Sequence, residues 1–150
     1  MPKQPFGKLN VGDIRKDIIE NPVIVTIEAT IKDALKKLIE KHHTSHIYVT
    51  NKEGKMIGSI HVNNVIEYLF PYETVWQSNS EYVPMSIFSK ERLEDILTRD
   101  FYYVYDSTKI SDMISILLRE KINELPVLDS EMRIIGEVNI FEVITAYLRD

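Results

Sequence analysis

An internal repeat restricts the fold of this chain more than any other feature of its sequence. Residues 47–69 and 122–148 each contain two short apolar runs, a polar turn between them, and then apolar residues at helical spacing. Gly58 and Gly136 hold the same place in the second run of each copy, seventy-eight positions apart. A glycine inside a strand usually marks a bulge or the close approach of another segment to the backbone. We therefore predict a strand pair followed by a helix, used twice.

A longer helix is predicted upstream of each strand pair. Its apolar residues follow the pattern i, i+3, i+4, i+7, i+8, which gives a helix one buried face. The second set lies seventy-nine positions after the first, and we expect the spacing to change by one across the turn at residues 51–55. Thr30, with Asp33 three residues later, is the expected N-cap of the first helix, and Ser107 or Thr108 that of the second. The apolar positions are Ile31, Ala34, Leu35, Leu38 and Ile39 in the first copy, and Ile110, Met113, Ile114, Leu117 and Leu118 in the second.

The segments that precede the long helices also correspond. Residues 11–18 are expected to form a short helix with Asn10 as its N-cap, and residues 22–27 form an extended apolar run. The second copy restarts at residues 93–96 and continues through the run 102–105. Both halves are therefore predicted to contain the same elements in the same order.

These boundaries divide the chain into four parts. Residues 1–9 form a polar arm that we expect to be ordered only where it docks. Residues 10–70 form the first repeat and residues 93–150 the second. The connection between them, residues 71–92, is long and contains aromatic side chains. We expect this connection to pack, either onto its own module or onto another chain.

Bulk properties narrow the functional classes. The composition, 44% hydrophobic and 27% charged, is typical of a soluble globular domain, and 150 residues suffice for one shared core. The formal net charge of -5 argues against binding to a nucleic-acid backbone, which requires a basic surface. Residues 1–10 lack the apolar core of a secretory signal, and no apolar run approaches the ~20 residues of a membrane helix. We therefore expect a cytoplasmic protein that does not insert into membranes.

The chain contains few motifs associated with catalysis, phosphate binding or metal binding. The chain has no cysteine, no HExxH motif and no glycine loop for phosphate binding. His42, His43 and His46, with His61 one strand away, are the nearest approach to a metal site. Adjacent histidines at a helix end also have a simpler role, because a positive charge there is favoured by the helix dipole. We expect neither a specific metal site nor an enzymatic activity, since no paired carboxylates are placed for acid/base catalysis.

The order of a strand, a long helix, two strands and a short helix, used twice, resembles a tandem pair of CBS domains, or Bateman module. The resemblance covers residues from about 10 to 150 and includes the sequence LPVLD before the second turn and a glycine after each turn. It implies an α/β fold with two β-α-β-β-α repeats packed about a pseudo-two-fold axis, and commonly a homodimer. It also implies an adenine nucleotide or adenosyl ligand, of the AMP, ATP or S-adenosylmethionine type, in the cleft between the repeats. We accordingly expect a stand-alone, non-enzymatic sensor that signals to a partner protein.

The same resemblance assigns the ligand-binding residues. The family pattern has a Ser or Thr that helps to hold phosphate, then two residues, then an Asp that accepts from the ribose hydroxyls. His61 and Asn64 stand at these two positions in the first repeat, and Asn139 and Glu142 in the second. Adenine is usually held by the first strand and by residues just ahead of the second, and Tyr103 either stacks on a base or packs on the sheet. The implied set is Ile24, Val25, Ser45, His46, Ile47, His61 and Asn64 in the first repeat, and Tyr103, Val104, Glu124, Leu125, Pro126, Asn139 and Glu142 in the second.

Both repeats depart from the family pattern at these positions, which leaves a second hypothesis open. The chain would then be a constitutive dimerising or scaffolding module that does not bind nucleotide, with residues 71–92 as a contact surface. A third hypothesis is a small metal sensor that uses the histidines, and zinc binding sensitive to substitution of His46 or His61 would support it.

Overall fold

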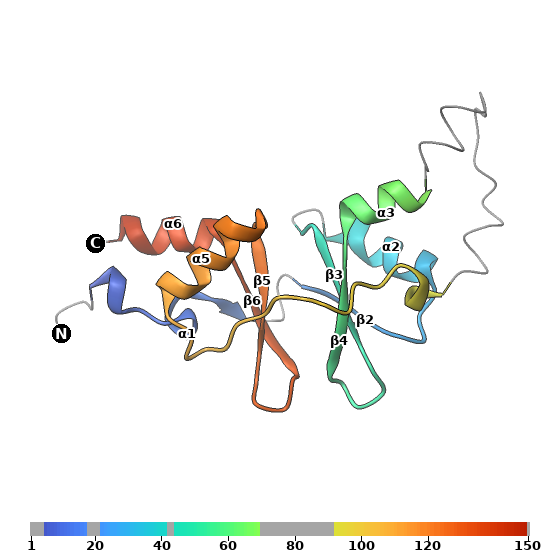
Figure 1. Cartoon of the computed structure of the whole chain (residues 1–150), viewed down its shortest axis with the longest axis horizontal. Coiled ribbons are helices and arrows are strands. Elements are labelled where there is room, and N and C mark those ends of the chain that lie inside the picture. Colours follow the sequence, from blue (N-terminus) through green and yellow to red (C-terminus); the bar gives the residue numbers. More distant parts are fainter. Residues whose placement is uncertain (1–4, 18–21, 42–43, 70–91, 150) are drawn as a thin grey trace, which may run out of the picture. The chain divides into compact units, whose positions relative to one another are not determined.

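The computed structural model describes residues 5–17, 22–41, 44–69 and 92–149 of the chain (Figure 1). It has an α/β fold, and the predicted repetition of its elements is confirmed. The chain forms two compact units, each with its own three-stranded sheet. Unit 1 comprises Met1–Pro22 and Tyr102–Asp150, and unit 2 comprises Val23–Phe101. Each unit therefore includes the N-terminal segment of the other repeat.

Unit 2 contains most of the first repeat. Its sheet has the order β2-β3-β4, in which β2 runs parallel to β3 and β3 antiparallel to β4. Alternate strand residues form a core with residues of α2 and α3, so that both helices cover the same face of the sheet. The elements are β2 (Val23–Thr26), α2 (Ile31–Glu40), β3 (His46–Thr50), β4 (Met56–His61), α3 (Val62–Leu69) and the 3-10 helix η3 (Leu93–Asp95). The buried core consists of Val23, Val25, Ile31, Ala34, Ile47, Val49, Ile60, Val65 and Leu93.

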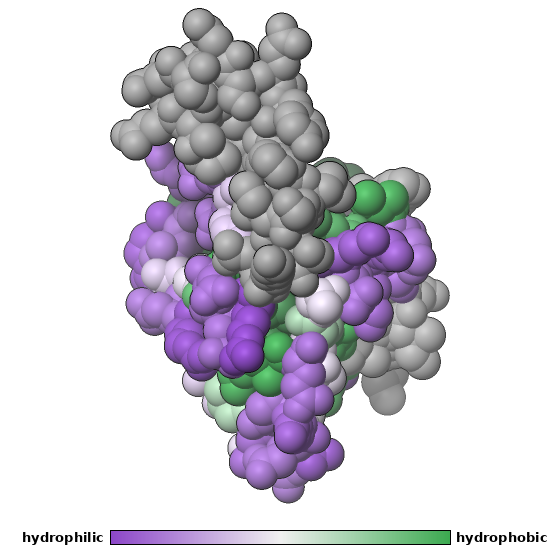
Figure 2. Space-filling view, turned by 90° about the vertical axis from the view of Figure 1, so that its right-hand side faces the viewer, coloured by the Kyte–Doolittle hydropathy of each residue, from purple (hydrophilic) through white to green (hydrophobic). Residues whose placement is uncertain are grey.

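Helix α2 keeps its charged residues on the side away from this core. Ile31 and Ala34 are buried, whereas Lys32, Asp33, Lys36 and Lys37 are exposed. The predicted apolar stripe is thus confirmed at four of its five positions, because Leu35 and Leu38 also pack against the core. The exception is Ile39, which is 68% exposed. Figure 2 shows a largely hydrophilic surface with smaller apolar areas between the polar ones.

Unit 1 is built in the same way from the second repeat. Its sheet has the order β1-β6-β5, with antiparallel pairing throughout. The elements are η1 (Phe6–Lys8), α1 (Val11–Ile14), β1 (Lys16–Asp17), α5 (Ile110–Glu120), β5 (Glu124–Leu128), β6 (Ile134–Asn139) and α6 (Ile140–Leu148). The buried core consists of Val11, Val104, Ile110, Met113, Leu117, Leu125, Val127 and Val138.

The described part of the N-terminal arm docks in unit 1. Phe6 and Leu9 pack against its core, and the ring of Phe6 meets the edge of Tyr147 with 5.5 Å between centroids. The carbonyl of Leu9 accepts a hydrogen bond of 3.1 Å from the amide of Ile110. The arm therefore satisfies one of the free amides at the start of α5.

The predicted N-cap of the long helix is confirmed in the first repeat and wrong in the second. Thr30 caps α2 as predicted, because its hydroxyl accepts from the amide of Asp33 at 3.1 Å. The prediction of Ser107 or Thr108 as the cap of α5 is wrong, since the N-cap is Lys109. The hydroxyl of Thr108 instead accepts from the amide of Tyr105 at 2.9 Å and closes the turn before the helix.

The short N-terminal helix ends earlier than predicted. Asn10 does precede α1, and its amide donates to the Asp13 carboxylate at 2.8 Å. The helix stops at Ile14 rather than Ile18, because Arg15 is extended with φ -70° and ψ 152°. Strand β1 follows at once and pairs with β6, so the sheet of unit 1 takes residues that local periodicity placed in a helix.

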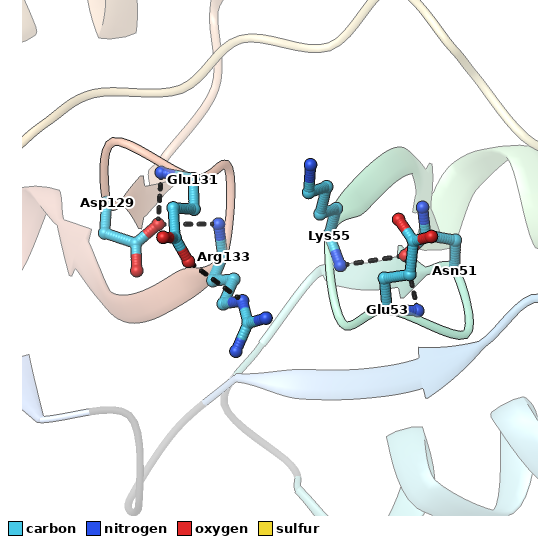
Figure 3. Close-up of polar contacts among 6 residues, drawn as sticks. All are labelled: Asn51, Glu53, Lys55, Asp129, Glu131 and Arg133. Atoms are coloured by element: carbon cyan, nitrogen blue, oxygen red, sulfur yellow. Dashed lines mark hydrogen bonds and ion pairs between the residues drawn. The ribbon is translucent and has the colours of Figure 1, made fainter.

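The two strand-pair turns have the same length, so the predicted change of spacing across residues 51–55 is wrong. Asn51 Oδ1 accepts from the amides of Glu53 and Lys55, both at 3.0 Å (Figure 3). In the second repeat, residues 129–133 form the same turn: Asp129 Oδ1 accepts from Glu131 N at 2.8 Å and Arg133 N at 2.9 Å. The same side-chain chemistry therefore fixes both turns.

The distance between corresponding residues of the two repeats changes from seventy-nine to seventy-eight positions between the long helix and the strand that follows it. Helix α5 ends in Lys121, which has left-handed φ 55°, whereas Lys41 after α2 has φ -115°. This left-handed end lets β5 begin at Glu124 after a shorter connection than the one that leads to β3. As a result, His46 is structurally equivalent to Glu124, because the two pair with His61 and Asn139 respectively.

The first strand of the second repeat is shorter than its counterpart. Strand β2 pairs with β3 along its whole length, but the predicted run 102–105 contributes only a parallel bridge between Val104 and Val127. Val104 donates to Pro126 O at 3.1 Å and accepts from Leu128 N at 2.9 Å. The order of elements is retained, with a strand reduced to one bridged residue.

The predictions for Gly58 are confirmed. It pairs with Val49 beside a shift in the register of β3 and β4, which is the expected bulge. Leu97 fills the space that a side chain of Gly58 would need, and Thr98 exchanges backbone hydrogen bonds of 2.9 and 3.0 Å with Ser59. A segment at the start of the second repeat thus covers the edge of β4 in unit 2.

Candidate functional site

The sheet of unit 2 has a polar face opposite its apolar core. His46 and His61 are cross-strand partners, as are Tyr48 and Ser59. The rings of His46 and His61 meet edge to face with centroids 4.8 Å apart, and His46 stacks on Tyr48 at 6.1 Å. His46 is 9% exposed and Tyr48 1%. The structure therefore brings two predicted site residues, His46 and His61, into direct contact.

Three other predicted residues of the first repeat have different positions: in the core, beside His46 and on the surface of α3. Ile47 belongs to the apolar core, so its side chain faces the helices. Ser45 precedes β3, and its hydroxyl lies 3.5 Å from Nδ1 of His46. His61 Nδ1 accepts from the amide of Asn63 at 3.0 Å, which requires a lone pair on that nitrogen. Asn64 is exposed on α3, one turn beyond this contact.

The sheet of unit 1 has a corresponding polar face. Glu124 pairs with Asn139, and Pro126 with Glu137. Glu124 is 5% exposed and Glu137 4%. Leu125 belongs to the core, so its side chain points to the opposite face. Sequence reasoning missed Glu137, although strict alternation from Asn139 along the strand would have placed it on the same face.

Asn139 and Glu142 hold the start of α6. The amide of Glu142 donates to Asn139 Oδ1 at 2.9 Å, and the amide of Asn139 donates to Glu142 Oε1 at 3.2 Å. Glu142 is 7% exposed. This is a reciprocal capping box, and the Asn-x-x-Glu spacing in the sequence was a signal for it. The two residues assigned to a ligand by resemblance therefore also have a structural role.

A hollow of about 420 Å³ lies between β2 and α2 in unit 2. Strand β2 is the edge of its sheet, and the Lys37 ammonium donates to the carbonyl of Ile24 at 3.3 Å. Ile24 and Val25, both predicted to contact adenine, line the hollow. Three charged residues of α2 were missed; they lie at i, i+3 and i+4 on one helix face. The full lining is Ile24, Val25, Thr26, Ala29, Asp33, Lys36 and Lys37.

Tyr103 of unit 1 lies seventy-nine positions after Ile24 and corresponds to it in the second repeat. It contacts another tyrosine. Its ring meets the edge of Tyr105 with centroids 5.5 Å apart. A side-chain hydrogen bond with Tyr103 raises the pKa of Tyr105, and the charge of an ionised Tyr103 and partial burial act in the same direction. Val104 is buried in the core. The structure thus shows Tyr103 in an aromatic pair with Tyr105.

The described residues contain neither a group of metal ligands nor a helix able to span a membrane. Within the described ranges, no three His, Asp or Glu side chains are grouped as ligands for a metal ion. His42, His43 and most of the connection 71–92 lie outside those ranges. None of the described helices has both the length and the apolar character needed to cross a bilayer.

The fold and the two repeats define a tandem CBS-domain protein. The family described as CBS domain matches residues 11–71 and 93–149, so the chain belongs to this family. A homoserine O-acetyltransferase of Methanosarcina acetivorans is 34% identical over 115 residues. The match covers 76% of this chain, but the chain spans only 18% of the length of that relative.

Solved structures share the fold across nearly the whole chain. CBSX2 in complex with AMP is 23% identical with a TM-score of 0.72, over 94% of this chain and 97% of that one. The CBS domain pair of protein MJ0100, in complex with 5′-methylthioadenosine and S-adenosyl-L-methionine, is 20% identical with a TM-score of 0.69. That match covers 95% of this chain and 98% of that one. At this level of identity the likeness establishes the fold.

Proposed function

We propose that this protein is a non-enzymatic regulatory module that binds an adenine nucleotide or adenosyl compound and signals its presence to a partner protein. Membership of the CBS family supports the proposal, as do the AMP and S-adenosyl-L-methionine complexes of proteins with the same fold. The observation that carries it is the hollow beside β2, because Ile24 and Val25, the residues that the resemblance assigns to adenine, form part of its wall.

The polar groups of both units suit such a ligand. Asn64 and Asn139 offer amide oxygens, and Glu142 offers a carboxylate, as acceptors for ribose hydroxyls. The role of Glu142 in the capping box does not exclude this contact, because a carboxylate accepts several hydrogen bonds. Ligand binding would act by shifting a conformational equilibrium, to an extent limited by the difference in affinity between the two states.

A ligand panel on the whole protein tests this function. Thermal unfolding is measured with AMP, ADP, ATP and S-adenosylmethionine, since a ligand of the native state stabilises it by RT ln(1 + [L]/Kd). We expect one class of adenosyl compound to raise the midpoint. A flat panel at millimolar ligand would contradict the proposal.

Replacement of Glu142 by Gln separates its two roles. The amide oxygen of Gln still accepts from the amide of Asn139, so we expect the midpoint without ligand to change little. Loss of the charge should weaken the bound adenosyl compound by about 1.5 to 3 kcal/mol, as for hydrogen bonds to charged groups. Isothermal titration measures the affinity; equal affinities for the wild type and Glu142→Gln would remove Glu142 from the site.

A scaffolding function is the second candidate, and the surface of α6 favours it. Phe141, Ile144 and Leu148 are 72%, 48% and 73% exposed, and their spacing places them on one face of the helix. This exposed apolar face is suited to a homodimer contact. A flat ligand panel, together with a dimer in light scattering that Ile144→Lys converts to a monomer, would favour the scaffold.

A further inference from the structure

Charged side chains of α2 border the hollow between β2 and α2, and the family resemblance did not predict them. Lys36 and Lys37 lie on its helical side, and Asp33 lies one turn earlier on the same helix. The hydrogen bond of 3.3 Å to Ile24 O holds the ammonium of Lys37 at the wall. Two cations and one anion thus border a space whose opposite wall is an edge strand.

Neither cation is present at the corresponding place in unit 1. Positions seventy-nine residues after Lys36 and Lys37 are Ser115 and Ile116. Ser115 is occupied with its own helix, since its hydroxyl donates to Ser111 O at 3.0 Å. The two lysines are therefore not required by the repeat fold, because α5 forms the same helix without them.

The size and chemistry of the hollow fit a nucleotide. Its volume of about 420 Å³ lies in the usual range of small-molecule sites. The outer edge of a terminal strand offers backbone donors and acceptors, which can pair with the edge of a base. Lysine ammonium groups bind phosphate oxygens through charge-assisted hydrogen bonds, whereas they repel a cationic sulfonium.

We propose that this hollow binds the phosphate groups of the ligand through Lys36 and Lys37, so that the protein takes adenosine di- or triphosphate in preference to S-adenosylmethionine. The inference rests on the proposed function and specifies its ligand class. It also places the phosphate-binding lysines in unit 2, because unit 1 has Ser115 and Ile116 at the corresponding positions. Asp33 opposes binding, because it lines the same hollow and its negative charge repels phosphate.

Isothermal titration of the full chain with ATP, AMP, adenosine and S-adenosylmethionine tests the inference. We expect affinity to increase with the number of phosphates, and ATP affinity to fall as salt is raised. Lys36→Gln and Lys37→Gln should each weaken ATP about tenfold, with adenosine unchanged within about twofold. Lys37→Gln removes the charge but keeps an N–H donor in the side chain. Lys32→Gln is the matched control, since Lys32 is an exposed lysine of α2 outside the hollow and its loss should leave ATP affinity unchanged.

Asp33→Asn should change the affinity for ATP in the opposite direction to the lysine variants. This variant removes the negative charge and keeps the backbone amide that donates to Thr30, so ATP should bind several times more tightly. Damage to the fold would not tighten binding, and the unfolding midpoint of each variant without ligand monitors such damage.

The outcomes separate this inference from the proposed function. ATP binding that is insensitive to Lys36 and Lys37, or equally sensitive to Lys32, overturns the inference and leaves the function intact. Tighter binding of S-adenosylmethionine than of ATP has the same consequence. If no adenine compound binds, the proposed function fails and the inference fails with it.

Discussion

Gly58 makes room for a segment that is distant in the sequence. A Cβ atom at this position would lie 2.5 Å from Leu97 Cγ and 2.8 Å from Thr98 O, both closer than a real Cβ contact. The leucine side chain can rotate, but the carbonyl belongs to a backbone that pairs with Ser59. The glycine is therefore required by tertiary packing rather than by its own backbone angles.

Gly58→Ala should lower the free energy of unfolding by about 1 to 3 kcal/mol, the usual cost of overpacking. Chemical denaturation measures the change. The penalty should be smaller in a Leu97→Ala background, though not zero, because Thr98 O remains in place. Gly7→Ala is the control, since no atom lies within 4 Å of the added group, and it should change stability by less than about 0.5 kcal/mol. Equal effects at both glycines would refute the packing argument.

At the scale of elements, the two strand-pair turns have the same hydrogen-bond pattern, although their first residues differ in type. Asn51 and Asp129 each direct one side-chain oxygen at two backbone amides of their own turn. An amide oxygen and a carboxylate oxygen can each accept both of these bonds. The turn geometry thus depends on an acceptor at its first position and not on charge.

Asp129→Ala should destabilise the β5–β6 turn by about 1 to 2 kcal/mol, because two hydrogen bonds are lost. Asp129→Asn should be close to the wild type, since the first repeat uses Asn at this position. Hydrogen exchange at the amides of Glu131 and Arg133 provides a local readout, and it should accelerate in the Ala variant alone. Similar exchange in both variants would contradict the role of the acceptor.

At the scale of the whole molecule, the two compact units exchange the N-terminal segments of their repeats. Val11 is fully buried in the core of unit 1, and Leu93 is fully buried in the core of unit 2. The N-terminal segment is held further by an ion pair with 2.6 Å between Arg15 Nε and Asp106 Oδ1. Each core therefore depends on a chain segment from outside its own repeat.

This exchange predicts where a core substitution acts. Val11→Ala should lower the stability of unit 1 by about 1 to 3 kcal/mol, and Leu93→Ala that of unit 2 by about 2 to 5 kcal/mol. Hydrogen exchange should accelerate in β5 and β6 for the first variant and in β3 and β4 for the second. If each variant instead affected the repeat that follows it in the sequence, the division into these units would be wrong.

The sequence alone determined the features that depend on neighbours along the chain. The spacing of apolar residues predicted both long helices, and the paired runs around Gly58 and Gly136 predicted the strand pairs. Thr30 was identified as a cap because its partner Asp33 is three residues away. The candidate residues Ile24, Val25, His46 and His61 came from a family resemblance, which rests on the same local order.

Tertiary structure decided what depends on residues far apart in the chain. Residues 16–17 are in a strand because β6 offers an edge, and α5 is met by the Leu9 carbonyl rather than by a side-chain cap. The charged hollow exists because α2 packs beside the edge strand β2. Periodicity records which face of an element is buried, but it carries no information on which other element covers that face.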